Sequence, residues 1–469
     1  MAERIAGVYH PRNAKASPLY GLVEDHFDEF ESVYDDRFAE KHGFWRPVIR
    51  KIVNRFLDCG DLRHGFARIR CENPDCGNEM LLAYSCHGRY FCPSCHAKRV
   101  AAFADWMDAE ILADVPHRQQ VFTIPKLLRQ HFRFDRKLLG LLSSCAYDAV
   151  REMLLSVADD PRAVPGMVIS VQTYGDQTAN WHPHSHALVT DGVFRPDGSF
   201  QPLPPLDPQQ LMLLFRHKLL QELLRLGKIY PATIEILDRF RHTGFSAFQG
   251  PPVLPGDTAA REKLAIYLLH PAISLDRLSY DGPNGTVDYR PKSSPGHPLL
   301  ADDAPHQDPL EVLASLTDHI PNKGQQLVRY LGWYSSKSRG LRNKASHTVA
   351  AATTPCSSLP RAESLPDPDD TPYRKACRRT WAKLIEKVYL VSPLICPKCS
   401  FPMKVIAFIE DQAVIRKILK HLGIWETPPR PPPKKIVPSL PAEPMEEDLL
   451  PWVADPMYSH DDPDPVYPD

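Results

Sequence analysis

The sequence predicts an α+β protein in which a helical N-terminal region and a cysteine-rich module precede a domain built on an antiparallel sheet. Apolar and aromatic residues recur at three- and four-residue steps over residues 18–57, as in amphipathic helices. Six of the eleven cysteines then fall between Cys59 and Cys95. From residue 118 onward, short β-rich runs end at Pro, Gly or Asp and alternate with longer helical patterns.

The predicted elements follow one another in a simple order. Two helices are expected in residues 18–57, and another follows the cysteines at 97–112. The predicted strands lie at residues 118–125, 166–175, 184–194 and 231–237. The later helices are expected at residues 126–156, 208–227, 258–269 and within 308–343, with a loop or β-turn segment at 281–307. The second and third strands are close enough in sequence to form a hairpin, which favours an antiparallel sheet.

The length of 469 residues corresponds to two to four domains at roughly 100–200 residues each. Thirteen prolines fall in residues 428–469, and such a segment is expected to be disordered or extended. The regions we expect are an N-terminal helical region (1–58), the cysteine-rich domain (59–112), the sheet domain (113–345), a small C-terminal domain with a CPKC motif (371–425) and a disordered Pro-rich acidic tail (426–469).

The net charge of the whole chain hides two unlike parts. Lys and Arg total 56 and Asp and Glu total 57, which by itself argues against a large nucleic-acid surface. Residues 443–469 hold nine carboxylates and no Lys or Arg, so residues 1–442 carry 56 basic and 48 acidic groups, a net charge of +8. The sequence has no apolar run near the ~18 residues of a membrane span and no apolar signal-peptide core, so we expect a cytoplasmic protein.

Four cysteines have the spacing of a zinc ribbon or finger. Cys71 and Cys76 form one close pair, and Cys92 and Cys95 form a CxxC pair about fifteen residues later. Each pair can supply two thiolates to a tetrahedral ion, and soft sulfur ligands favour zinc. The alternative ligand is Cys86, and spare candidates are Cys59, His64, His87 and His96. A structural zinc, a zinc module that also presents cations to phosphates, and a metal-free set of buried cysteines all remain open.

Alternate histidines in the segment WHPHSHALVTDG predict a second kind of metal site. Because successive side chains of a strand point to opposite faces, His184 and His186 share a face and can reach one divalent cation. Two histidines leave coordination positions open for water and phosphate oxygens, as a catalytic site requires. Gln172 on the preceding strand and His182 are candidates for the third ligand. The alternative is that the histidines only line a polar strand face.

Tyr267 lies on the predicted helix 258–269, just before Pro271. A tyrosine hydroxyl is a weak nucleophile at neutral pH, but its attack on a phosphodiester is feasible when a divalent cation neutralises the phosphate and orients the scissile bond. Spacing alone favours a core or surface role for this tyrosine over a catalytic one.

The order of these motifs resembles that of the rolling-circle transposases of insertion-sequence family ninety-one, which are HUH-type single-strand endonucleases. The resemblance covers nearly all of residues 18–424. The segments that carry it are FARIRCENPDCGNEMLLAYSCHGRYFCPSCHAKR, VPHRQQVFTIPKLLR, VQTYG, HPHSHALVTDGVF, LAIYLLHPAISLDRLSYDG, HIPNKGQQLVRYLGWYSSKSRG and WAKLIEKVYLVSPLICPKCSFPMKVIAFIED.

The resemblance implies that the sheet domain (113–345) is an HUH-type catalytic domain, and it implies roles for residues of that domain. His184 and His186 match the two ligands of the catalytic cation, for which we expect Mg²⁺ or Mn²⁺. Tyr267 matches the tyrosine that cuts DNA, keeps the 5′ end as a phosphotyrosine and leaves a free 3′-OH. Two positions depart from the family: Ser185 replaces a usual hydrophobic residue, and Lys263 stands where some members have a second tyrosine. The chain is thus expected in the single-tyrosine subgroup, where the nucleophile is regenerated or a homodimer supplies a second one.

The implied partners are single-stranded DNA at the element ends and target DNA, with the protein at the bacterial nucleoid. Cations combined with aromatic rings suit phosphates and stacked bases. The residues expected to contact DNA are Arg89, Lys98, Arg99, Trp333, Tyr334, Lys337 and Arg339. For Trp333 and Tyr334 the alternative is a core aromatic pair. The CPKC motif at Cys396 and Cys399 either binds a second zinc with Cys377 or Cys356, or forms a tight turn with free thiols.

The sequence therefore favours a metal-dependent tyrosine DNA endonuclease and strand transferase that moves an insertion sequence. One alternative is a catalytically inactive zinc-dependent DNA-binding regulator. Another is a replication initiator or relaxase with the same chemistry.

Overall fold

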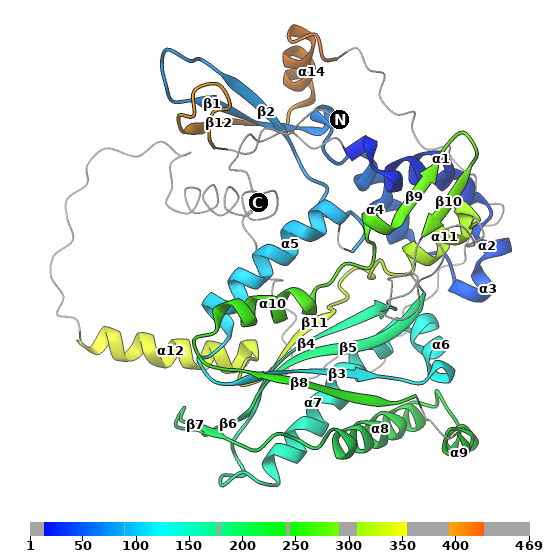
Figure 1. The fold of residues 1–469 in the computed structure, drawn as a ribbon, viewed down its shortest axis with the longest axis vertical. Helices are drawn as coiled ribbons and strands as arrows, with labels where there is room; N and C mark the ends of the chain where they lie inside the picture. Colours follow the sequence, from blue (N-terminus) through cyan, green and yellow to red (C-terminus); the bar gives the residue numbers. More distant parts are fainter. Residues whose placement is uncertain are drawn as a thin grey trace.

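The computed structural model describes residues 14–88, 90–175, 180–240, 244–289, 307–353 and 394–425. These residues form helices and antiparallel sheets, which confirms the predicted α+β class. A five-stranded sheet and its helices occupy one end of the molecule, the N-terminal helices lie beside them, and a three-stranded sheet occupies the opposite end (Figure 1).

The N-terminal helices enclose a core of aromatic side chains. The two helices expected in residues 18–57 are present, with shorter turns around them: η1 (Ala14–Ala16), α1 (Pro18–Ser32), α2 (Tyr34–Arg37), α3 (Ala39–His42) and α4 (Pro47–Leu57). Ser17 caps α1, since its side chain accepts a hydrogen bond from the Tyr20 amide. Buried residues of these helices pack with α11 (Pro309–Thr317), with η5 (Leu275–Arg277) and with the hairpin of β9 (Leu278–Asp281) and β10 (Thr286–Tyr289).

The central sheet has five antiparallel strands in the order β11-β4-β5-β3-β8. Its strands are β3 (His117–Thr123), β4 (Gly166–Tyr174), β5 (Trp181–Thr190), β8 (Ser246–Val253) and β11 (Val328–Gly332). Strands β4 and β5 form the predicted hairpin, and every residue of β4 is buried. Helices α7 (Leu139–Leu155) and α8 (Pro208–Arg225) cover one face, whereas α5 (Pro93–Trp106), the π-helical turn η3 (Met107–Ile111) and α10 (Thr258–Leu268) lie on the other side (Figure 1).

Several local predictions in this domain are wrong. The strand predicted at 231–237 is the helix α9 (Pro231–Arg239), because Pro231 occupies the first helical turn and the β-branched residues follow a helical path. Strand β8 was not predicted because its sequence SAFQGPPV contains a glycine and two prolines, and β11 was not because it is only five residues long. The helix predicted at 126–156 is interrupted at Asp135 and forms three pieces: α6 (Lys126–Phe134), η4 (Arg136–Leu138) and α7. Asp135 caps the middle piece, η4.

The third predicted strand also ends early. Strand β5 stops at Thr190, and a short hairpin of β6 (Gly192–Phe194) and β7 (Phe200–Pro202) follows. Gly192 has a φ of +154° and its Cα lies against the β7 backbone, so a side chain at this position would collide with Gln201. Helix α12 (Ser336–Thr353) follows β11.

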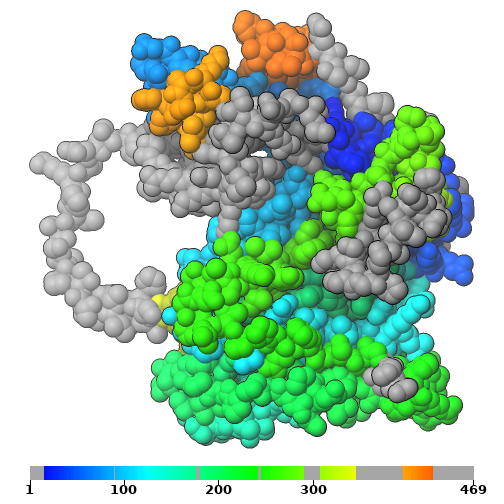
Figure 2. All heavy atoms as spheres, in the orientation of Figure 1, coloured from blue at the N-terminus to red at the C-terminus, as the bar shows by residue number. Residues whose placement is uncertain are grey.

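The three-stranded sheet joins two segments that lie on either side of the central domain in the sequence. Its strands are β1 (Phe66–Cys71), β2 (Glu79–Ala83) and β12 (Met403–Ile409), in the order β12-β1-β2. The turn η2 (Leu62–His64) precedes β1, and helix α14 (Gln412–His421) follows β12. Strand β12 pairs with β1 from Phe66 opposite Ile409 to Cys71 opposite Met403. The expectation of a separate C-terminal domain is therefore corrected: residues 394–425 complete the cysteine-rich module, and Figure 2 shows the two segments in contact. Residues 371–393 and the tail at 426–469 lie outside the described residues.

Candidate active site and metal centres

The histidines of β5 lie on one face of the central sheet. Ser185 and Ala187 are fully buried, whereas His184 and His186 are half-buried on the opposite face, as the alternation of a strand requires. Gln172 of β4 lies directly opposite His184 in the antiparallel register. The hairpin thus places Gln172, His184 and His186 side by side, and the ring of His182, the other candidate for the third ligand, lies 5.2 Å from that of His184. Among the described residues, the Ser185 hydroxyl has no hydrogen-bond partner, which is consistent with a position that suits an apolar side chain.

The two imidazole rings converge on one point. The Nε2 atoms of His184 and His186 are 3.0 Å apart. Two nitrogens held at ~2.1 Å from one cation, at right angles, would be separated by about the same distance. The Nδ1 atom of His184 lies 2.8 Å from the His182 carbonyl, which can only accept, so Nδ1 carries the proton and Nε2 presents its lone pair. The Gln119 side-chain amide from β3 lies 3.3 Å from His186 Nδ1. When this amide presents its oxygen to the ring, Nδ1 carries the proton and Nε2 of His186 also presents its lone pair to a cation.

The environment keeps His186 uncharged. Burial, together with the nearby His184 and His270, lowers the pKa of His186 to about 3. A neutral imidazole is the form that binds a metal ion. The histidine pair therefore fits a divalent cation.

The helix that carries Tyr267 is attached to the sheet beside the histidine pair. The Gln172 amide nitrogen donates a hydrogen bond of 2.8 Å to the Tyr267 carbonyl and lies 3.5 Å from that of Leu268. With the nitrogen so engaged, Oε1 is the Gln172 atom that retains lone pairs for a cation. The Tyr267 side chain is 45% exposed and so accessible to a macromolecular substrate. The structure thus brings Gln172, His184, His186 and the backbone of Tyr267 together.

The end of α10 is anchored by two further residues. His96, buried on α5, places its Nε2 atom 2.6 Å from the Leu269 carbonyl. Burial lowers the pKa of His96 to about 4, so its ring is neutral at pH 7. The Tyr174 hydroxyl, at the end of β4, donates to the His270 carbonyl. These contacts position the last turn of the tyrosine helix relative to both α5 and the sheet.

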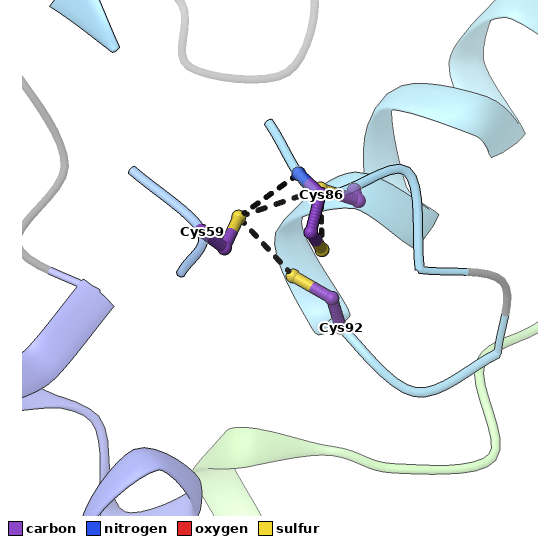
Figure 3. Close-up of side chains that lie close together, drawn as sticks. Cys59, Cys86 and Cys92 are labelled. Carbon is purple, nitrogen blue, oxygen red and sulfur yellow. Dashed lines mark hydrogen bonds between the residues drawn. The ribbon is translucent and has the colours of Figure 1, made fainter. Parts of the chain in front are cut away.

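Four cysteines form a set that we call the proximal cluster: Cys59, Cys86, Cys92 and Cys95. Their sulfurs face one another, as Figure 3 shows for the three labelled residues. All four sulfurs lie within 4.8 Å of one another, and the Sγ–Sγ distances include 3.5 Å between Cys86 and Cys95 and 3.9 Å between Cys59 and Cys92. A tetrahedral zinc with bonds of ~2.3 Å has edges of about 3.8 Å, so this set fits zinc. Cys92 and Cys95 begin α5, the helix that reaches the tyrosine helix through His96.

A second set, the split cluster, comprises Cys71, Cys76, Cys396 and Cys399. The predicted single site of Cys71, Cys76, Cys92 and Cys95 is therefore corrected, because the two pairs belong to different clusters. Cys86, the predicted alternative, and Cys59, a spare candidate, complete the proximal cluster. Desolvation acts to raise the pKa of Cys396, but the backbone amides of Cys399 and Lys398 donate to its sulfur, and the pKa falls to about 6. The suggested partners of the CPKC motif, Cys356 and Cys377, lie outside the described residues.

The structure overturns part of the predicted DNA surface. Tyr334 is completely buried, and its hydroxyl lies 2.7 Å from Nε2 of His117, so it cannot stack on a base. Both faces of Trp333 are covered: Phe194 stacks on it at 4.3 Å, and the Arg342 guanidinium lies 4.0 Å from its ring centre. The alternative of a core aromatic pair holds here, because both rings close the edge of the central sheet.

The predicted cations are distributed differently. Lys337 is exposed on α12, whereas Arg339 lies against the rings of Trp106 and Tyr330. Lys98 and Arg99 are half-buried on α5, one turn beyond Cys95. Arg89 lies outside the described residues. Of this set, Lys337 is the described cation best placed to meet a phosphate.

Two features of these sites were not predicted. The positioning contacts of His96 and Tyr174 to the end of α10 join residues whose spacing in sequence gives no signal. The pairing of Cys71 and Cys76 with Cys396 and Cys399 had one signal, since both pairs are close cysteines next to a short strand pattern.

Among the described residues, no helix combines the length and apolar character needed to cross a membrane. Two family models match the chain: "transposase zinc-binding domain" over residues 27–124 and "putative transposase" over residues 166–341. The former belongs to the IS91 group by its name. No solved structure matches the chain significantly.

Two curated proteins are similar over most of the chain. The transposase for insertion sequence element IS801 of Pseudomonas savastanoi pv. phaseolicola is 27% identical over 318 residues, covering 64% of this chain and 73% of that protein. The putative transposase y4qJ of Sinorhizobium fredii (strain NBRC 101917 / NGR234) is 25% identical over 396 residues, covering 78% of this chain and 90% of that protein.

Proposed function

Because the chain belongs to the IS91 family of transposases, which process DNA, we propose that it nicks and rejoins single-stranded DNA at insertion-sequence ends through a 5′-phosphotyrosine during rolling-circle transposition. The observation that carries this proposal is the attachment of the Tyr267 backbone to Gln172, next to the converging Nε2 atoms of His184 and His186. A nucleophile helix and a pair of imidazoles then share one half-buried face of the central sheet.

In the proposed reaction, the Tyr267 oxygen attacks the phosphorus of one phosphodiester. A bond forms between that oxygen and phosphorus, the bond from phosphorus to the 3′ oxygen breaks, and the leaving 3′ oxygen takes up a proton. The reverse step rejoins a strand, because a 3′-OH attacks the phosphotyrosine and releases the tyrosine. One phosphodiester is exchanged for another in each step, so the reaction needs no external energy source.

The chain's own residues supply the positioning. We propose that His184, His186 and Oε1 of Gln172 hold Mg²⁺ or Mn²⁺, which would neutralise phosphate charge and orient the scissile bond. Gln172 in addition holds the Tyr267 carbonyl, so that the same side chain aligns nucleophile and ligands. The proximal cluster holds zinc in a structural role, at the start of the helix that contacts α10.

Single-stranded DNA at the element ends and the target DNA are the proposed substrates, in the cytoplasm of the bacterial cell. Lys263 lies exposed one helical turn before Tyr267, at the position of the second tyrosine of other members. With one tyrosine per chain, either that tyrosine is regenerated between two cleavages or a homodimer supplies the second.

The test incubates the full-length protein with labelled single-stranded DNA from the element ends and Mg²⁺ or Mn²⁺. We expect a protein–DNA adduct that survives denaturation and is absent in Tyr267→Phe and in the double variant His184→Ala with His186→Ala. The matched control is Tyr230→Phe, which removes an exposed hydroxyl from the same domain and should leave the adduct unchanged.

An adduct in Tyr267→Phe would contradict the nucleophile assignment. Binding of the DNA without cleavage by the wild type would instead favour the regulator. A transposase is distinguished from a replication initiator by the sequence around its gene. For a transposase, defined element ends should flank the gene, and the same ends should recur elsewhere in the genome.

A further inference from the structure

We infer that the split cluster is a second structural zinc site, which the chain closes by bringing Cys396 and Cys399 onto Cys71 and Cys76. The family match for zinc binding ends at residue 124 and so contains only half of these ligands. The inference does not depend on the proposed nuclease chemistry.

The sulfur positions are those of a tetrahedral site. The Sγ atoms of Cys71 and Cys399 are 3.4 Å apart, and those of Cys76 and Cys396 are 3.7 Å apart. All four lie within 4.8 Å of one another, close to the ~3.8 Å edge of a zinc–thiolate tetrahedron and far beyond the ~2.05 Å of a disulfide. The Asn78 side-chain amide lies 3.5 Å from the Cys396 sulfur and can donate to it, which favours the thiolate.

The backbone around both pairs forms matching turns. The residues that follow Cys76 and Cys399 are Gly77 and Ser400, and both have a left-handed φ, +57° and +58°. Ser400 is not a glycine, so this conformation has a cost that the surrounding structure must offset. The Ser400 amide donates to the Cys396 carbonyl at 2.9 Å, which closes the turn. A turn of this kind directs two sulfurs to the same point.

One backbone hydrogen bond connects the two turns, and one more closes each of them. The Glu72 amide, next to Cys71, donates to the Pro402 carbonyl at 3.0 Å. The Cys71 amide donates to the Asn78 carbonyl at 2.9 Å, and the Met403 amide to the Leu394 carbonyl at 2.7 Å. The cluster therefore lies at one end of the sheet, where β1 ends and β12 begins.

The three-stranded sheet packs Phe66 of β1 against Ile415 and Leu419 of α14 on one side, but the side that carries the split cluster has little apolar material. The buried group next to the cluster is Ala67, Ile69, Cys71, Leu82, Cys396, Met403 and Val405. Two of these residues are cluster ligands, so a large part of the interior is sulfur. Small modules of this kind commonly rely on a metal in place of a core. Because Cys76 and Cys396 are separated by 320 positions, this ion would join segments on either side of the whole catalytic domain.

The test counts zinc in the full-length protein by elemental mass spectrometry. We expect two ions per chain, one for each cluster. The paired variants Cys396→Ser/Cys399→Ser and Cys71→Ser/Cys76→Ser should each retain one ion, and the variant with all four changes should also retain one. The matched control is Cys145→Ser, since Cys145 is a buried thiol of α7 outside both clusters and should leave two ions.

Alkylation of native protein, read by peptide mass spectrometry, identifies which thiols lose their metal. In Cys396→Ser/Cys399→Ser, Cys71 and Cys76 should become reactive while the proximal cluster stays protected. Two retained ions, or a wild type with one, would overturn the inference. If a serine pair unfolds the protein, the variant Cys399→His serves instead, because it keeps a metal ligand at that position. The spectrum of its cobalt-loaded form should show that one four-sulfur site has changed to three sulfurs and one nitrogen. An unchanged spectrum would refute the site.

Discussion

The five-stranded and three-stranded sheets are both antiparallel, yet different interactions stabilise them. In the central sheet, β4 is buried along its entire length between neighbouring strands and helices. In the small sheet, Ile406 and Phe408 of β12 are 41% and 52% exposed, and the buried group beside the split cluster is small. The comparison indicates that apolar packing holds the sheet that carries the histidine pair, whereas the small sheet packs one side against α14 and relies on metal ligation at the side with the split cluster.

Removal of zinc should have the largest effect, and it should destabilise the small sheet but not the central sheet. Structural zinc sites contribute roughly 10–16 kcal/mol of apparent binding energy to small domains. After treatment with a strong chelator, amide hydrogen exchange of β1, β2 and β12 should therefore accelerate by several orders of magnitude, while β3, β4 and β5 stay protected. The measurement is hydrogen exchange followed by mass spectrometry. Equal loss of protection in both sheets would show that the central sheet also depends on metal.

A matched pair of core truncations tests the same contrast without touching the metal ligands. Ile169 of β4 and Ile69 of β1 are both 0% exposed. Ile169→Ala should lower the free energy of unfolding of the central domain by about 2–5 kcal/mol, because it leaves a cavity among packed side chains. Ile69→Ala should leave the main thermal transition unchanged and speed exchange only in β1, β2 and β12. A fall in the main transition with Ile69→Ala would mean that both sheets unfold as one unit.

His96 tests whether the proximal cluster and the active site communicate through α5. His96→Ala leaves the Leu269 carbonyl without its buried partner, a loss of roughly 1–3 kcal/mol. We expect the rate of adduct formation to fall about tenfold, equivalent to about 1.4 kcal/mol, with unchanged zinc content and DNA affinity. Single-turnover cleavage measures the rate, and His96→Gln, which keeps a donor, should recover part of it. A wild-type rate in His96→Ala would exclude a positioning role.

Local patterns predicted the histidine face but not everything around it. Two-residue periodicity placed His184 and His186 on one face, and a short connection placed Gln172 opposite them, because register follows from hairpin geometry. The same reasoning failed at Pro231, where β-branched composition suggested a strand but the proline begins a helix. Tyr334 was misplaced because burial depends on tertiary neighbours such as His117, which the local sequence does not reveal.

The cysteines show a similar limit. Spacing correctly identifies pairs that can bind one ion together, such as Cys92 with Cys95, since the turn between them is local. Spacing does not determine which pairs share an ion. Cys71 meets Cys399 only because β12 adds to the edge of β1, and that pairing depends on the fold of all intervening residues.

The last expected effect is a pH dependence of stability to which a buried histidine of the central sheet contributes. His117 of β3 is 0% exposed, and burial lowers its pKa to about 4. In the unfolded chain the ring takes up a proton near pH 6.5, whereas in the folded chain it stays neutral until about pH 4. Its stabilising effect is therefore complete above pH 6.5 and is lost as the pH falls toward 4, with a slope of at most about 1.4 kcal/mol per pH unit.

Urea unfolding at pH 6.5, 5.5 and 4.5 measures that slope, and His117→Gln is the variant that removes the titrating ring. His117→Gln should be less stable at pH 6.5, because the 2.7 Å contact with the Tyr334 hydroxyl is altered, but its stability should fall less steeply with acid. The strands of the small sheet contain no histidine, so acid should affect that sheet through protonation of zinc-binding thiolates, whose affinity for the metal is pH-dependent. Excess zinc should then restore the small sheet at pH 5.5 and leave the slope of the central sheet unchanged. A slope in His117→Gln as steep as in the wild type would assign the acid sensitivity to other groups.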